Sequence, residues 1–315
     1  MLLLVMSAQA SEPPPAVPPG DTLLFASPTR KDRIGRILAP VMINGRGPFR
    51  LIVDTGASYS TVSPQLAQTL GLQPSDDLPF LVNGITCSAR VPSVPIDHLQ
   101  AGDLSFRSIR LPVVWAPVMA GADGILGAAG LKEERIMVEF LHNRVTISRS
   151  QRGMAPRGFQ RVHATLTSNG LLTVEVRVGG IRARAVIDTG ADRSLGNQAL
   201  RDALRHWQNA RKAPQFTDVY GTTADIQQGE LGLAPTITVG PLKMIDVSLI
   251  YGDFHIFEVW KMREQPALIL GMDVLGSVNS LGIDFRNQEL YFGGAFLGVG
   301  DTATPQCLEA PSCQG

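Results

Sequence analysis

Short runs of alternating apolar and polar residues, broken by glycine and proline, fill most of this chain. Alternation with a period of two turns one face of a segment toward a core and the other toward water, which is typical of β-strands. In the first half, Ile37–Ile43 is such a run, Asn44-Gly45 is a hairpin turn, and residues 49–53 form the returning strand. The pattern predicts mostly antiparallel β structure.

Few segments have the features of a helix. Ser63-Pro64 places a capping side chain before a proline, and this predicts a short helix that ends near Leu70. Asn197 can cap a second helix, which we expect to be longer and to run through Arg211.

The second half of the chain repeats the strand order of the first. Leu172–Val178 predicts a strand, Gly179-Gly180 a turn, and residues 183–187 the returning strand. Each returning strand ends in the same tripeptide, Asp54-Thr55-Gly56 in one half and Asp188-Thr189-Gly190 in the other, 134 positions apart. The repeat predicts two lobes of one fold.

Two more elements follow each tripeptide in the same order. An apolar run that ends in glycine occupies Gly124–Gly127 and again residues 268–271, with an offset of 144 between the last glycines. Acidic-Phe pairs at Glu139-Phe140 and Asp284-Phe285, 145 apart, each precede a turn and a further strand. The second half therefore carries about ten extra residues between its tripeptide and its apolar-Gly run, and we assign them to the longer helix after Asn197 and to loops.

Paired aspartates suggest a specific chemistry. Two carboxyl groups held close together cannot both ionise, so the pair shares one proton over a broad pH range. The ionised carboxylate can take a proton from water while the protonated partner donates to a carbonyl oxygen. Glycines at positions 56 and 190 allow close approach of the backbone and supply N–H donors to the carboxylates. A single Asp-Thr-Gly is also a common turn sequence. Because the tripeptide occurs twice at equivalent positions, we interpret Asp54 and Asp188 as a pair.

An apolar strand that ends in Asp-Thr-Gly and precedes two apolar residues and a glycine resembles the pepsin-like and retropepsin-like aspartic proteases. The resemblance spans nearly all of residues 33–295. It implies a mostly β, two-lobed, retropepsin-like β-barrel fold with an internal duplication, in which Asp54 and Asp188 form one catalytic dyad without a cofactor. It also implies that Thr55 and Thr189 hydrogen-bond across the lobe junction, and that each apolar-Gly segment packs beneath a catalytic loop.

The same resemblance suggests residues that contact substrate. Gly84 in the first half, and Tyr220 and Gly221 in the second, fall where the family places its flaps, the hairpins that close over substrate. An ordinary surface hairpin is the alternative for the second of these segments. Asp192 follows the second tripeptide as in viral members, where this acid contacts the substrate backbone, but the arginine that pairs with it there is absent here. Asp192 is therefore either a substrate contact or a loop-stabilising residue.

Ala57 and Ala191 follow the two tripeptides, at positions where pepsin-like enzymes commonly carry Ser or Thr. A hydroxyl at these positions would donate toward the carboxylates and favour their ionised form. Its absence predicts a shared proton that persists to higher pH, and hence an optimum at mildly acidic to near-neutral pH.

Composition narrows the range of expected binding partners and cofactors. The 28 basic and 28 acidic residues leave no net charge, which does not favour nucleic acid or an anionic membrane surface. Three cysteines and five histidines show no metal-ligand spacing, and HExxH and GxSxG are absent, so we expect no metal and no cofactor. Cys307 and Cys313 would be bridged in an oxidising compartment or remain free, and Cys87 stands alone. Tryptophans 115, 207 and 260 are expected in a core or lobe contact rather than in a binding platform.

The N-terminus predicts export. Residues 1–10 resemble a signal peptide that is cleaved after Ala10, although the apolar run is short and could be a ragged N-terminus. A proline-rich linker (11–30), two lobes (31–155 and 156–298) and a flexible tail (299–315) follow. No later stretch reaches the roughly 20 apolar residues that cross a bilayer, so we expect no stable membrane insertion and a periplasmic or secreted location.

These features together predict an aspartic endopeptidase that acts on polypeptides, as a monomer or a homodimer. Two alternatives stay open. One is a catalytically inactive peptide-binding module of the same fold, which the intact pair of aspartates disfavours. The other is a homodimer in which each lobe pairs with its copy.

Overall fold

The computed structural model describes residues 22–28, 30–31, 36–101, 104–114, 119, 121–142, 144–153, 155–207, 213–223 and 225–294, with only the backbone described up to residue 31. The expected signal peptide, the first part of the linker, the tail with both of its cysteines, and Trp115 lie outside the described residues. No helix in the part of the chain described is long and apolar enough to cross a membrane.

The first lobe is a curled sheet of eight strands among the residues described. Its order is β5 (Thr61–Val62), β9 (Gly124–Gly127), β4 (Arg46–Asp54), β3 (Ile37–Ile43), β7 (Ser88–Ala101) and β6 (Ser75–Asn83), with β2 (Arg30–Lys31) beside β3 and β8 (Leu104–Pro112) beside β7. Helix α1 (Pro64–Leu70) begins where it was predicted, because the Ser63 hydroxyl accepts from the Leu66 N–H at 3.0 Å. A short 3-10 helix, η2 (Ala128–Gly130), follows β9.

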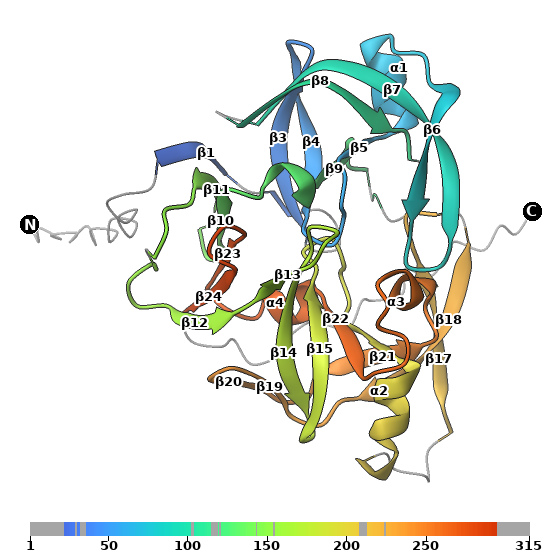
Figure 1. Cartoon of the computed structure of the whole chain (residues 1–315), viewed down its shortest axis with the longest axis vertical. Helices are drawn as coiled ribbons and strands as arrows, with labels where there is room; N and C mark the ends of the chain where they lie inside the picture. The colour runs from blue at the N-terminus through green and yellow to red at the C-terminus, as the bar shows by residue number, and fades with distance from the viewer. Residues whose placement is uncertain are drawn as a thin grey trace, which may run out of the picture.

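The second lobe repeats this arrangement, with ten strands among the described residues (Figure 1). Its order is β17 (Gln215–Tyr220), β18 (Ile226–Leu233), β21 (Ser248–Gly252), β16 (Leu195–Asn197), β22 (Ala267–Leu270), β15 (Ile181–Ile187), β14 (Leu172–Val178), β19 (Ile237–Val239) and β20 (Leu242–Met244), with β13 (Thr165–Leu166) beside β14. Its helices are α2 (Gln198–Ala203), η3 (Arg205–Trp207), α3 (His255–Val259) and α4 (Met272–Leu275). The predicted internally duplicated, mostly β fold is confirmed.

A third sheet joins the two halves. Its order is β1 (Thr22–Pro28), β11 (Arg144–Arg149), β10 (Glu134–Glu139), β23 (Ser280–Asp284), β24 (Glu289–Gly293) and β12 (Gln160–His163). Strands β10 and β23, one from each half, pair directly. Across this pair the buried Arg135 guanidinium donates to the buried Asp284 carboxylate at 2.8 Å, so charge as well as backbone pairing links the halves.

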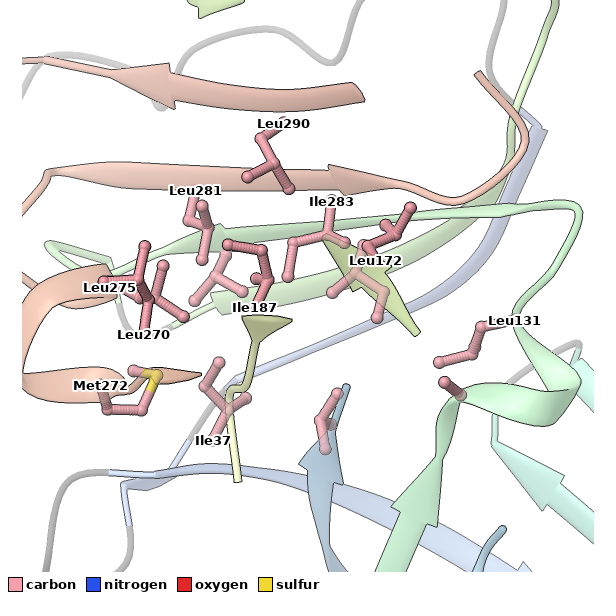
Figure 2. Close-up of a cluster of buried hydrophobic side chains, with 14 of the residues drawn as sticks. Ile37, Leu131, Leu172, Ile187, Leu270, Met272, Leu275, Leu281, Ile283 and Leu290 are labelled. Atoms are coloured by element: carbon pink, nitrogen blue, oxygen red, sulfur yellow. The ribbon is translucent and has the colours of Figure 1, made fainter. Parts of the chain in front are cut away.

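One hydrophobic core runs through both lobes and the shared sheet. Figure 2 shows part of it, where side chains from strands far apart in sequence converge. The labelled residues are Ile37, Leu131, Leu172, Ile187, Leu270, Met272, Leu275, Leu281, Ile283 and Leu290. Burial of each large aliphatic side chain contributes about 1.5–3 kcal/mol, so this cluster fixes the two lobes relative to each other.

In each lobe, the strand that leads to the tripeptide pairs with the apolar-Gly strand in the same way. Strand β4 runs parallel to β9, with Asp54 opposite Gly127, and β5 pairs with the other side of β9. In the second lobe β15 runs parallel to β22, with Ile187 opposite Leu270, and β16 pairs with β22. The apolar-Gly runs are therefore central strands that hold the ends of β4 and β15 in place.

The helix after Asn197 differs from its prediction. The Asn197 side chain caps it as expected, accepting from the Leu200 N–H at 2.8 Å, but α2 ends at Ala203 rather than at Arg211. Leu204 is buried, whereas all three residues of η3 that follow are exposed, so no apolar face holds a longer helix. The extra length of the second half is instead divided between the segment after α2 and helix α3.

Candidate active site

The two tripeptides bring their aspartates together at the junction of the lobes. Asp54 ends β4, Asp188 follows β15, and their carboxyl groups hydrogen-bond to each other. Asp188 is 7% exposed and Asp54 is partly buried. The duplicated strands thus place two carboxyl groups from distant parts of the chain in direct contact.

Backbone N–H groups donate hydrogen bonds to each carboxylate in the same way. The Gly56 and Ala57 N–H groups donate to Asp54 Oδ1 at 2.9 and 2.8 Å. In the second loop, the corresponding amides of residues 190 and 191 donate to Asp188 Oδ1 at 2.8 and 3.1 Å. Each aspartate therefore has one oxygen fixed by two donors, which leaves the other for its partner or for a substrate.

The glycines of the tripeptides are required by the opposite aspartate. A Cβ placed on Gly56 would lie 2.4 Å from the Asp188 Cγ, and one on Gly190 would lie 2.2 Å from the Asp54 Cγ. Real side-chain carbons do not approach so closely. Any other residue at position 56 or 190 would push the two carboxyl groups apart.

The threonines of the tripeptides form a reciprocal set of bonds across the junction. Thr55 Oγ1 donates to the Ile187 carbonyl at 2.8 Å and accepts from the Thr189 N–H at 3.1 Å. Thr189 Oγ1 donates to the Val53 carbonyl at 2.7 Å and accepts from the Thr55 N–H at 3.2 Å. Both threonines are fully buried, so these bonds fix one loop against the other in a site from which water is excluded.

The apolar-Gly runs pack against the aspartate loops. A Cβ on Gly127 would lie 2.5 Å from the Tyr59 carbonyl carbon, and one on Gly271 would lie 2.7 Å from that of Arg193. The N–H groups of these two glycines donate to Ser60 Oγ at 3.1 Å and to Ser194 Oγ at 3.0 Å. The glycine of each run is thus the position at which the aspartate loop crosses the strand.

Burial shifts both carboxyl groups toward the protonated form, and repulsion by Asp54 adds to the shift of Asp188. Burial raises the pKa of Asp54, and its N–H donors and the nearby Arg36 guanidinium lower it in part. Burial also raises the pKa of Asp188, and the negative charge of Asp54 raises it further, so that it lies well above the ordinary value. One carboxylate beside one carboxylic acid is the state that these shifts favour.

A cleft of about 1050 Å³ contains both aspartates. Its apolar lining comes from both lobes: Ile52, Val114 and Ile125 from the first, and Leu195, Ile250 and Trp260 from the second. A volume of this size exceeds that of most small-molecule pockets.

The hairpins β6–β7 and β17–β18 line the cleft and meet at their tips. Thr86 Oγ1 and Thr223 Oγ1 lie 3.0 Å apart in a hydrogen bond, and the Ile256 N–H of α3 donates to the Ile85 carbonyl at 3.3 Å. Figure 1 shows the β6 hairpin reaching across from the first lobe to α3. The first-lobe hairpin is therefore docked on the second lobe.

The residues predicted to contact substrate all border this cleft. Gly84 lies at the turn after β6, and Tyr220 and Gly221 lie at the end of β17. Asp192 is exposed on the loop after the second tripeptide and also lines the cleft. A contact of any of these four residues with substrate stays a prediction.

The tryptophan prediction is wrong for Trp207, which is 63% exposed because η3 presents all of its side chains to solvent. Trp260 is partly buried, packs edge-on against Phe257, and borders the cleft.

Sequence reasoning missed several residues that support the dyad or join the two lobes. Ser60 and Ser194 share the offset of 134 that relates the tripeptides, and that regularity could have identified them. Arg36 precedes β3 and has no counterpart in the second half, while His255 contacts Ser88 at 2.7 Å across the lobes. Nothing in the local sequence marks the last two.

Comparison with known proteins supports the same picture. The sequence model of a family described as aspartyl protease matches this chain at residues 39–129 and 174–274. Each match contains one Asp-Thr-Gly tripeptide and one apolar-Gly run, and together they cover more than half of the chain. A search of curated proteins found no match.

Proposed function

Because this chain belongs to the aspartyl protease family, we propose that it is an endopeptidase that hydrolyses polypeptides with water activated between Asp54 and Asp188. The observation that carries this proposal is the direct hydrogen bond between the two buried carboxyl groups. Neither group alone supplies both an acid and a base, and the pair supplies both.

The proposed reaction uses one proton shared by the dyad. The ionised carboxylate takes a proton from water, and the resulting hydroxide adds to the carbonyl carbon of the peptide bond. The protonated carboxyl group donates its proton to the carbonyl oxygen, which gives a neutral gem-diol. This diol collapses when one of its hydroxyl protons returns to the dyad and a proton passes to the leaving nitrogen, so that the C–N bond breaks into an acid and an amine.

The surroundings of the dyad suit this reaction. Apolar residues of both lobes line the cleft on its two sides, and the two hairpins border it. Exclusion of water other than the attacking molecule strengthens the hydrogen bonds to the carboxylates. Entry of a polypeptide requires the Thr86–Thr223 contact between the hairpin tips to open, as lids do in many hydrolases.

The experiment uses the full chain with a mixture of unfolded proteins, with and without pepstatin, and mass spectrometry to find the cleavage sites. Asp54→Asn and Asp188→Asn are each expected to abolish cleavage and to leave the fold intact. Asp246→Asn is the matched control, because Asp246 is an exposed turn residue with a φ of 57° that asparagine also adopts. Wild-type rates in either dyad variant would refute the proposal, and binding without cleavage by the wild type would indicate a peptide-binding module.

A mixture of the two inactive variants tests the oligomeric form. We propose one intramolecular site, supported by the Thr55–Thr189 bonds within a single chain. No activity should then return on mixing. Substantial recovery would indicate swapped dimers, in which the first lobe of one chain pairs with the second lobe of the other.

We also propose that the protein acts in the periplasm or outside the cell. The support is the apolar run and small residues of the first ten positions. N-terminal sequencing of protein from the producing cell should give Ser11 as the first residue. An intact Met1 on cytoplasmic protein would refute export.

A further inference from the structure

A buried arginine contacts the loop of the second tripeptide. Arg36 precedes β3, is 4% exposed, and donates from Nη1 to the Gly190 carbonyl at 3.4 Å. Gly190 itself lies against the Asp54 carboxyl group, since a Cβ there would lie 2.2 Å from its Cγ. The first lobe therefore places a positive charge near Asp54, across the loop that belongs to Asp188.

The second half of the repeat has no positive charge at the equivalent position. The offset of 134 relates Arg36 to Gly170, which has a φ of +83° in the turn before β14 and also lines the cleft. The contact in this region is neutral, from Ser58 Oγ to the Asn169 carbonyl at 3.3 Å. The two aspartates have equivalent amide donors, so this difference in charge breaks the near-twofold symmetry of the site.

We propose that Arg36 is a positioning residue that makes the two aspartates inequivalent, so that Asp54 is the base that deprotonates water and Asp188 is the acid that protonates the carbonyl oxygen. These roles rest on the proposed protease function. The distribution of the proton between Asp54 and Asp188 is a property of the protein without substrate, and it can be measured separately.

The direction of the effect follows from electrostatics. A buried cation stabilises a nearby carboxylate far more than an exposed cation does, because solvent and salt screen exposed charges. Arg36 accordingly lowers the pKa of Asp54, whereas the charge of Asp54 raises that of Asp188. The other titratable side chains that border the cleft are Tyr59, Lys132, Asp192, Arg193, Asp218 and Tyr220. All six are exposed, so Arg36 is the buried charge that distinguishes the two sides in the part of the cleft that is described.

The decisive measurement is a carboxyl titration by NMR of protein labelled with ¹³C at aspartate. Asp54→Asn and Asp188→Asn identify the two signals. In the wild type, the Asp54 carboxyl should ionise first as pH rises. Arg36→Met should raise the pH at which that signal titrates by about one unit, as expected for removal of a nearby opposite charge, whereas Arg36→Lys should retain most of the wild-type value.

Lys132→Met is the control, since it removes an exposed charge from the same cleft, and its titration should match the wild type. Should Arg36→Met fail to fold, Arg36→Gln removes the same charge and keeps a donor for the Gly190 carbonyl. An unchanged Asp54 signal in the folded neutral variant, or Asp188 ionising first in the wild type, would overturn the inference.

Cleavage rates give a second readout. The acidic limb of the kcat/KM profile should move to higher pH in Arg36→Met, because that limb reports protonation of the base. A protein that cleaves nothing but shows the expected NMR shift would refute the proposed function and support the charge asymmetry. Cleavage with no displaced limb would overturn the roles assigned to Asp54 and Asp188.

Discussion

Replacement of Thr189 by valine is expected to weaken the junction between the lobes without changing the volume of the side chain. Its hydroxyl donates to the Val53 carbonyl at 2.7 Å and accepts from the Thr55 N–H at 3.2 Å. Both threonines are fully buried, so water cannot replace the lost partner.

The magnitude follows from the groups left behind. A buried N–H without an acceptor costs about 1–3 kcal/mol, and loss of a further hydrogen bond costs about 0.5–1.5 kcal/mol. Because valine adds no strain of its own at this position, we expect Thr189→Val to lower the free energy of unfolding by about 2–4 kcal/mol. Thr55→Val should cost a similar amount, since its bonds to Ile187 and Thr189 repeat the same geometry.

Urea unfolding at 25 °C, followed by circular dichroism, measures this difference. Thr189→Ser keeps the hydroxyl and should recover most of the loss. Thr69→Val is the matched control, because Thr69 also donates to a carbonyl, that of Gln65 at 2.8 Å, but lies on the exposed face of α1. A Thr189→Val protein as stable as the Thr69→Val control would show that the reciprocal bonds do not hold the lobes together.

Three other variants test the electrostatics. The double substitution Ala57→Ser and Ala191→Ser should move the alkaline limb of the pH profile of cleavage toward acid, because each serine hydroxyl can donate to a carboxylate and lower the pKa of the dyad. An alkaline limb at the wild-type pH would contradict this prediction. Burial and the Asp54 charge raise the pKa of Asp188 in the folded protein, so ionisation of Asp188 opposes folding at neutral pH. Asp188→Asn should therefore be more stable than the wild type at neutral pH. Urea unfolding at several pH values should show this advantage fading as pH falls through the raised pKa toward about 4, the pKa of Asp in the unfolded chain. Arg135→Met should lower the free energy of unfolding at neutral pH by about 3–5 kcal/mol, because the buried Asp284 carboxylate loses its cation, and a loss below 1 kcal/mol would contradict that reasoning.

Local signals account for the parts of the fold that the sequence predicted. Alternating residues and the Asn44-Gly45 turn specify the hairpin β3–β4, and Ser63 specifies the start of α1, each within a few residues. The duplication then related these local predictions to each other. It placed Asp54 and Asp188 at equivalent strand ends, and the family resemblance supplied the rule that equivalent ends meet.

The missed features depend on contacts between distant segments. The sheet that pairs β10 with β23, the contact of Thr86 with Thr223, and the approach of Arg36 to Gly190 each join residues more than 130 positions apart. No periodicity within a segment records such pairings. The end of α2 was predicted wrongly for a related reason, because Arg205, His206 and Trp207 are exposed and give a longer helix no buried face.

The two halves share the reciprocal threonine bonds between their tripeptides but differ in how each braces its own aspartate loop. Ser60 and Ser194 accept equivalent bonds from the two apolar-Gly runs, but Ser194 is further braced by the Asp273 carboxylate, which accepts from its hydroxyl at 2.7 Å and from its N–H at 3.0 Å. Two positions after Gly127 the first lobe has Ala129, which offers no side-chain acceptor. In a dimer of identical chains, every such change would appear on both sides of the dyad. A single chain with two lobes can alter one side alone, and this freedom allows one buried arginine to distinguish Asp54 from Asp188.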